Sequence, residues 1–105
     1  MHIPIIFTLY SFIYFIKMEV YLSMDWNRFI PADFEYDWDK DKLAKHGVCF
    51  EEAVETFFNN YKIRKNKQFY DRYQLIGYTD GGRKVKIIFQ LKPKKIVRII
   101  TGWPI

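Results

Sequence analysis

A chain of 105 residues has room for one compact domain with a single hydrophobic core. Half of its residues are hydrophobic and 20% are aromatic, which excludes a disordered tail. Cys49 is the single cysteine, so an internal disulfide is excluded, and no Cys/His pair has the spacing of a zinc site. These features fit a reducing cytoplasm, and we expect neither a bound metal nor a small-molecule cofactor.

The formal net charge of +5 is distributed unevenly along the chain. Residues 1–60 hold 5 Lys/Arg and 10 Asp/Glu, a net charge of −5, whereas residues 61–105 hold 12 and 2, a net charge of +10. A basic half of this density attracts polyanions through phosphate neutralisation and counterion release. The alternative is a solvated sheet surface that aids solubility. The aromatic residues interleaved with the cations favour RNA, because bases stack on aromatic rings.

Residues 1–23 form an apolar N-terminal extension. Its almost wholly apolar run, Ile3–Ile16, is shorter than the roughly 20 residues that a spanning helix needs. No positive region precedes the run and no small-residue cleavage site follows it, which argues against a secretory signal. We expect a mis-set translation start, with Met24 as a downstream alternative, or a loosely packed extension. A membrane anchor is the less favoured alternative.

The domain proper spans residues 24–105. Its first stretch, Met24–Trp38, contains a proline and mixed charges, which predict an irregular or edge-strand entry. Asp39–Lys45 runs from acidic residues to a lysine before Gly47, the order that complements a helix macrodipole and a glycine stop. Phe50–Phe58 has apolar residues on one side and glutamates on the other, the pattern of a short amphipathic helix.

From Tyr61 onward the pattern alternates, with β-branched and aromatic residues between turn signals, which predicts strands. Asp-Gly-Gly at residues 80–82 supplies one hairpin turn and Lys-Pro-Lys-Lys at residues 92–95 a second. We therefore expect an α+β fold with two short helices packed on an antiparallel four-stranded sheet. The expected strands are Tyr61–Lys67, Asp71–Thr79, Lys84–Leu91 and Ile96–Thr101.

Three segments together resemble a known family. A Trp-Asp pair at residues 38–39, followed by Lys-His-Gly-Val-Cys-Phe-Glu-Glu-Ala at residues 45–53, is similar to the opening signature of BrnT-like toxins, a branch of the RelE-type superfamily. Asp-Arg-Tyr-Gln-Leu-Ile-Gly at residues 71–77 and Val-Arg-Ile-Ile-Thr at residues 97–101 resemble two strands of the same family. The resemblance covers about Phe34–Thr101.

The resemblance implies a RelE-like fold and a toxin of a type II toxin–antitoxin system. Such a toxin is a metal-independent ribonuclease that inhibits translation and is neutralised by a cognate antitoxin protein. Two departures are visible. The spacer from Trp38 to His46 is short, which shortens the first expected helix by about one turn. The C-terminus is atypical, because Gly-Trp-Pro-Ile follows Thr101 where the family continues with an arginine and a helix.

Cleaving RNA without a metal requires a base for the ribose 2′-OH, donors for the phosphorane and an acid for the leaving oxygen. Arg72 and Arg98 suit the phosphorane, because a guanidinium donates two parallel hydrogen bonds to phosphate oxygens. His46 is the natural acid or base, since imidazole titrates near neutrality, and Lys45 beside it adds positive charge. The resemblance implies the same set, with Asp71 in the family's acidic position.

Each candidate also has a structural interpretation. His46 precedes a glycine at a helix end, so it is equally a residue that caps that terminus. Arg98 alternates with apolar residues and is a candidate partner for Asp71 or Asp37. Arg72 is a candidate edge-strand charge that resists aggregation.

Six further cations are expected to bind RNA, and four of them crowd one short strand. Such a density usually has a polyanion or an acidic partner nearby, and an antitoxin segment is the alternative occupant. The aromatic residues Tyr73, Tyr78, Phe89 and Trp103 are more often core residues than base-stacking platforms. A non-catalytic RNA-binding or protein-interaction module that keeps the toxin fold is the alternative function. The expected RNA-binding residues are Lys62, Arg64, Lys65, Lys67, Arg83 and Lys86.

Overall fold

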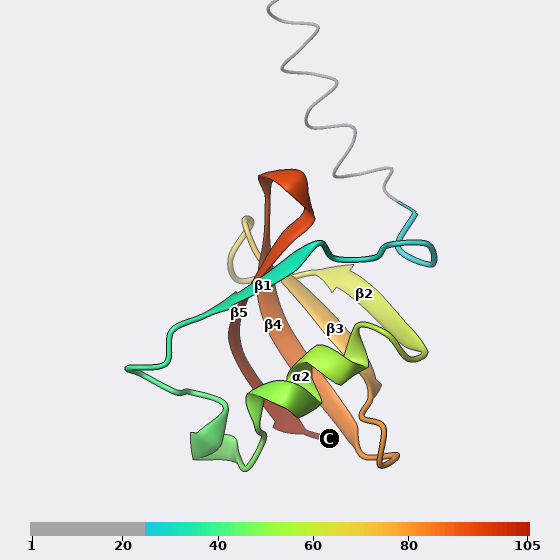
Figure 1. Cartoon of the computed structure of the whole chain (residues 1–105). Helices are drawn as coiled ribbons and strands as arrows, with labels where there is room; N and C mark the ends of the chain where they lie inside the picture. Colours follow the sequence, from blue (N-terminus) through green and yellow to red (C-terminus); the bar gives the residue numbers. More distant parts are fainter. Residues whose placement is uncertain (1–24) are drawn as a thin grey trace, which may run out of the picture.

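The computed structural model describes residues 25–105 (Figure 1), and the extension at residues 1–23 and the start at Met24 lie outside them. The described chain is α+β, as expected, with one sheet in the order β1-β5-β4-β3-β2. The strands are β1 (Asp33–Tyr36), β2 (Tyr61–Lys65), β3 (Tyr73–Tyr78), β4 (Lys84–Lys92) and β5 (Ile96–Pro104). The helical elements are α2 (Phe50–Thr56) and the 3-10 turns η1 (Ala44–His46) and η2 (Pro93–Lys95).

The sheet is mixed, which corrects the prediction of a purely antiparallel four-stranded sheet. Strands β2 to β5 form the expected antiparallel meander. β1 is a fifth strand that pairs in parallel with β5, with Phe34 opposite Val97. A four-residue edge strand is too short for its alternation to stand out, and its partner lies more than sixty residues further along the chain. Only an edge-strand entry was therefore predictable for this segment.

The helix expected over Asp39–Lys45 is not formed, so the prediction of two helices was wrong. The segment runs through turns into η1. Hydrogen bonds to Tyr36 form in place of helical ones. The Tyr36 hydroxyl accepts from the Leu43 amide at 2.9 Å and donates to the Asp41 carboxylate at 2.6 Å. Burial and the bond to Asp41 raise the pKa of Tyr36 to about 12. Asp41 has a φ of 37°, which an α-helix cannot continue. Leu43 alone is buried here, so no apolar stripe stabilises a helix.

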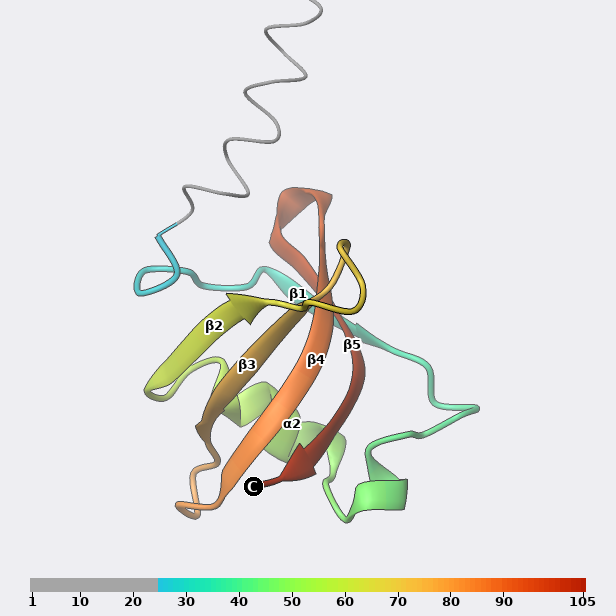
Figure 2. The same cartoon turned by 180° about the vertical axis from the view of Figure 1, so that it is seen from behind.

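α2 lies across one face of the sheet, as Figures 1 and 2 show from the two sides. Phe57, directly after the helix, packs edge-on against Phe89 of β4 and Phe34 of β1, with ring centroids 5.1 and 5.3 Å apart. Leu43 lies against β5, where a Cβ at Gly102 would be 3.1 Å from it. The hydrophobic core is therefore sealed by α2 and the segment that leads to it. Its central members are Leu43, Val48, Ala53, Phe57, Leu75, Val85, Ile87, Phe89, Val97 and Ile99.

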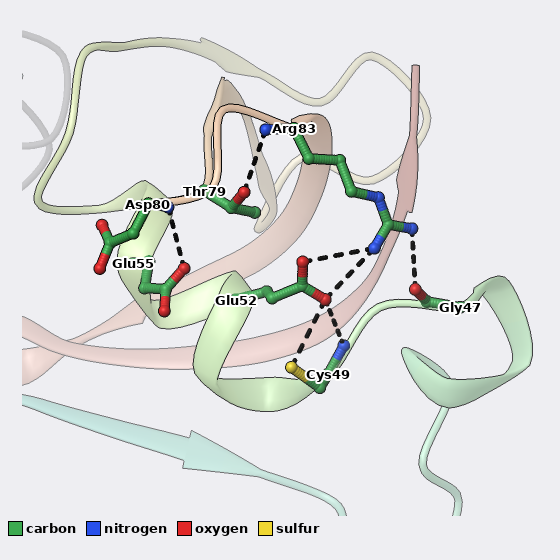
Figure 3. Close-up of polar contacts among 7 residues, drawn as sticks. All are labelled: Gly47, Cys49, Glu52, Glu55, Thr79, Asp80 and Arg83. Atoms are coloured by element: carbon green, nitrogen blue, oxygen red, sulfur yellow. Dashed lines mark hydrogen bonds and ion pairs between the residues drawn. The ribbon is translucent and has the colours of Figure 1, made fainter.

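The start of α2 is fastened to the turn between β3 and β4 by Arg83 (Figure 3). The Arg83 guanidinium donates to the Glu52 carboxylate at 3.2 and 3.3 Å and to the Gly47 carbonyl at 2.7 Å. Glu52 also accepts from the Cys49 amide at 3.3 Å. The bond from the Cys49 amide and the charge of Arg83 together lower the pKa of Glu52, so the carboxylate is kept ionised.

The length of the described helices bears on membrane insertion. Within residues 25–105, no helix is both long enough and apolar enough to cross a bilayer.

Candidate nucleic-acid interface

The sheet has an inner face, which α2 covers, and an outer face, over which no helix of the described chain lies (Figure 2). Successive side chains of a strand point to opposite faces, so the buried residues of β4 identify its inward positions. Val85, Ile87 and Phe89 are fully buried, and the positions between them, Lys86 and Ile88, point outward, although Ile88 is only 6% exposed. The outward positions of the sheet carry most of its charge. They include Glu35, Lys62, Arg64, Gln74, Lys84, Lys86, Gln90, Lys92, Arg98, Thr101 and Trp103.

Strand register aligns Arg72, Gln90 and Arg98 in one row across the outer face. Gln90 of β4 lies opposite Arg98 of β5. Tyr73 pairs with Phe89, so Arg72, which directly precedes β3, lies on the other side of Gln90. β4 therefore lies between the two arginines. Their backbones are about 10 Å apart, a gap that two long side chains can close around one phosphate.

A hollow of about 240 Å³ opens at this row, and we call it the arginine hollow. The segment after β1 forms its other wall, so the residues that line it come from four parts of the chain. Four of them are cationic and one is a carboxylate, which makes the hollow electropositive. It is lined by Asp37, Lys40, Lys42, Arg72, Gln90, Arg98, Ile99 and Ile100.

The arginines of the hollow keep donors available for a ligand. The Nε atom of Arg72 is buried and has no hydrogen-bond partner within the described chain, and its guanidinium lies 4.3 Å above the Phe69 ring. Arg98 has one distant carboxylate neighbour, Glu35 at 3.9 Å, which Lys92 binds more closely at 2.7 Å. The buried Nε of Arg72 is out of reach of a ligand in this conformation, whereas the Arg98 side chain is 42% exposed and makes no hydrogen bond within the described chain, so its donors are accessible.

Asp71 lies beside the arginine hollow and contacts it through Gln90. The Gln90 amide donates to the Asp71 carboxylate at 2.7 Å. Asp71 is therefore not the ion-pair partner of Arg98 that sequence reasoning considered, and it orients an amide that lines the hollow.

His46 and Lys45 lie apart from the hollow. His46 is the last residue of η1, directly before Gly47 in the left-handed conformation, and its ring contacts Trp103 with centroids 5.9 Å apart. Trp103 follows Arg98 by five residues on β5, so the two positions are separated by about 16 Å of extended strand. The structure thus brings Arg72, Arg98 and Asp71 together and leaves His46 and Lys45 at the opposite end of β5.

The six expected RNA-binding cations divide between the outer face, the helix side and the β2–β3 loop. Lys62, Arg64 and Lys86 belong to the outer face, and the Lys86 ammonium lies 5.8 Å from the centre of the Trp103 ring. Lys65 has the inward parity of its strand, and Lys67 follows the strand in the β2–β3 loop. Arg83 is held by Glu52 on the helix side (Figure 3).

Sequence reasoning missed several residues of the interface. Lys84, Gln90 and Lys92 share the outward parity of β4 with Lys86, and that alternation was readable once the apolar positions of the strand were assigned. Lys40 and Lys42 gave no signal, because their segment was expected to be helical. Phe69 and Tyr70 lie in the β2–β3 loop. An aromatic pair outside any strand was the feature of the sequence that could have indicated them as interface residues.

The chain matches no family model and no curated protein sequence. Within residues 25–105, no group of three or more His, Cys, Asp or Glu side chains is arranged to hold a metal ion.

Proposed function

We propose that this chain binds RNA on the outer face and cleaves it without a metal ion, as the toxin of a type II toxin–antitoxin system. A cognate antitoxin would neutralise it, and cleavage would inhibit translation. The arginine hollow carries the proposal, because the guanidinium groups of Arg72 and Arg98 both line it and can be offered to one phosphate. The resemblance of residues 38–53, 71–77 and 97–101 to BrnT-like toxins supports the same function.

The proposed reaction transfers a phosphoryl group within the RNA strand. The ribose 2′-oxygen attacks phosphorus, the bond to the 5′-oxygen breaks, and a 2′,3′-cyclic phosphate and a 5′-hydroxyl result. Arg72 and Arg98 stabilise the negative charge of the pentacoordinate intermediate. One proton leaves the 2′-hydroxyl and one is delivered to the 5′-oxygen. Asp37, which lines the hollow, is the group proposed to accept the first proton and to return it through a water molecule to the 5′-oxygen. His46 lies at the far end of β5, out of reach of a phosphate held in the hollow.

A non-catalytic RNA-binding module is the second candidate, and the position of His46 favours it. Its ring contacts Trp103 and lies outside the arginine hollow, so the described geometry does not join an imidazole to the two guanidinium groups. A protein with a phosphate site but no proton-transfer partner beside it would bind RNA without cleaving it.

The deciding experiment compares cleavage, binding and folding for Arg98→Ala and His46→Ala. We expect the first to lower the single-turnover cleavage rate by about 100-fold or more, as removal of one charge-stabilising donor does. RNA affinity should change little, because one cation among many contributes a small part of ground-state binding. The variant should also lose growth inhibition in a bacterial host. A stable wild-type protein that binds RNA and never cleaves it would establish the binding module instead.

The His46→Ala variant tests whether His46 takes part in cleavage at all. If His46 carries a proton, cleavage falls while the melting temperature holds. If it only caps η1, stability falls by about 1 kcal/mol and activity follows the folded fraction. Asp37→Asn is the matched variant within the hollow, and loss of cleavage in it alone assigns the proton transfer to the carboxylate.

Chelation tests the metal-independent part of the proposal. Because guanidinium groups and not a metal ion stabilise the intermediate, cleavage is expected to continue in EDTA. Loss of cleavage in EDTA and its return with Mg²⁺ would contradict the mechanism.

A further inference from the structure

The β2–β3 loop presents two neighbouring aromatic side chains to solvent beside the arginine hollow. Phe69 is 43% exposed and Tyr70 84% exposed. Neither belongs to the hydrophobic core, so their apolar surface contributes little to folding. We infer that they form a stacking platform for an unpaired base, so that the RNA proposed to enter the hollow is single-stranded there. This inference rests on the proposed function.

The loop that carries the aromatic pair is held by its own hydrogen bonds. The Asn66 amide donates to the Arg72 carbonyl at 2.9 Å, which closes the loop, and the Arg72 amide donates to the Phe69 carbonyl at 3.1 Å. The Asn66 side chain accepts from the amides of Gln68 and Phe69 at 2.8 and 3.1 Å. A platform ordered before binding loses little conformational entropy when a base stacks on it.

Arg72 joins the platform to the arginine hollow. Its guanidinium lies 4.3 Å above the Phe69 ring while the same side chain lines the hollow. A phosphate held by Arg72 and Arg98 would therefore place an adjoining base near Phe69 and Tyr70. The β2–β3 loop and the β4–β5 hairpin lie at the same end of the sheet, as Figure 2 shows. That hairpin adds Lys94 and Lys95, both exposed, which reinforces the preference for an anionic partner over a neutral one.

Stacking of this kind selects for single strands. In an A-form duplex the faces of the bases are covered by their neighbours, so an aromatic side chain finds no free base to stack on. A single strand can turn a base out onto the ring, and each such contact is sequence-tolerant because every base has a π-face. The platform therefore separates single-stranded RNA from duplex, and it does not read a particular base.

The test measures binding of 2′-O-methyl RNA, which lacks the nucleophilic hydroxyl and cannot be cleaved. Tyr70→Ser is expected to weaken binding of a single-stranded oligonucleotide by about tenfold and to leave binding of a duplex of the same length unchanged. Tyr70→Phe keeps the ring and should bind like the wild type. Phe58→Ser is the matched control, because Phe58 is 58% exposed and follows α2 on the other side of the sheet.

A second readout follows the base itself. A 2-aminopurine in the single strand should lose fluorescence when it stacks on wild-type protein and on Tyr70→Phe, and lose less on Tyr70→Ser. Unchanged single-strand affinity and unchanged quenching in a folded Tyr70→Ser protein would overturn the inference and leave the proposed function standing. Loss of neutralisation by the antitoxin, with RNA binding intact, would also overturn it and assign the pair to a protein partner. Wild-type protein that binds neither RNA form would instead overturn the proposed function.

Discussion

The two faces of the sheet are made by the same strands and differ in how their charges are matched. Arg83, on the helix side, is bound by a carboxylate and a carbonyl. On the outer face Glu35 is the carboxylate of the described chain that forms ion pairs, with Lys92 and Arg98, among a much larger number of cations. Charged side chains that are paired stabilise the fold, whereas cations that outnumber the nearby carboxylates are available to an anionic ligand. The difference separates positions that stabilise the protein from positions proposed to bind RNA.

Truncating a core side chain on the inner face should have the largest effect on the free energy of unfolding. Phe89 is fully buried and packs against Phe57 and Tyr73. Phe89→Ala should cost roughly 3 to 5 kcal/mol of unfolding free energy, because it removes a large transfer term and leaves a cavity. The measurement is urea denaturation. Lys86→Gln, on the outer face of the same strand, is the control, and an equal loss of stability there would contradict the division of the two faces.

Charge removal from β2 should change binding and spare stability. Lys62→Gln with Arg64→Gln removes two outward cations, so the slope of log affinity against log salt should become shallower by about 1.4, at roughly 0.7 per phosphate contact with a single strand. Lys65→Gln with Lys67→Gln removes the same charge from the inward position and the following loop. We expect a smaller change in that pair. Equal slopes in the two double variants would show that general charge, and not the outer face, attracts RNA.

Arg83→Gln should lower stability and leave RNA affinity as it was. We expect about 1 to 2 kcal/mol, the range for lost hydrogen bonds of a charged group, reduced because the side chain is partly exposed. The pH dependence follows from the lowered pKa of Glu52. Such a group stabilises the fold above its ordinary pKa, near 4.5, and the contribution is lost as pH falls through the folded value. Glu52→Gln should therefore flatten the acid limb of the stability curve, and an unchanged limb would contradict this contact's role.

Substitutions in the β4–β5 hairpin should have the smallest effects: they should raise stability and weaken RNA binding. Lys94 and Lys95 have φ values of 65° and 60°, which disfavour side chains other than glycine or asparagine. Lys94→Gly should raise the melting temperature, with a gain of about 1 kcal/mol, and weaken RNA binding slightly. Lys94→Asn relieves part of the strain and removes the same charge. A variant that gains stability and keeps its full salt slope would exclude the hairpin tip from the interface.

β4 illustrates which features of the fold can be predicted from the sequence alone. The alternation of Val85, Ile87 and Phe89 predicted a strand, and the structure confirms it with these three side chains fully buried; Ile88, on the other face, is buried as well. The same local reasoning predicted α2 correctly from the period of its apolar residues and glutamates. It failed at Asp39–Lys45, where a helix-like charge order had no apolar stripe to bury, and where Tyr36 captures the Leu43 amide.

What the residue pattern determined here is local: the periods of α2 and of β2 to β5, the turns between them, and the concentration of positive charge after residue 60. Backbone geometry fixes these periods, so they are visible in any short window of the chain. Tertiary structure alone decided which residues meet. The pairing of β1 with β5 and the register of β3, β4 and β5 placed Arg72 and Arg98 on either side of Gln90 and left His46 against Trp103. Contacts of this kind depend on which strands pair across the fold, and no local window contains that information.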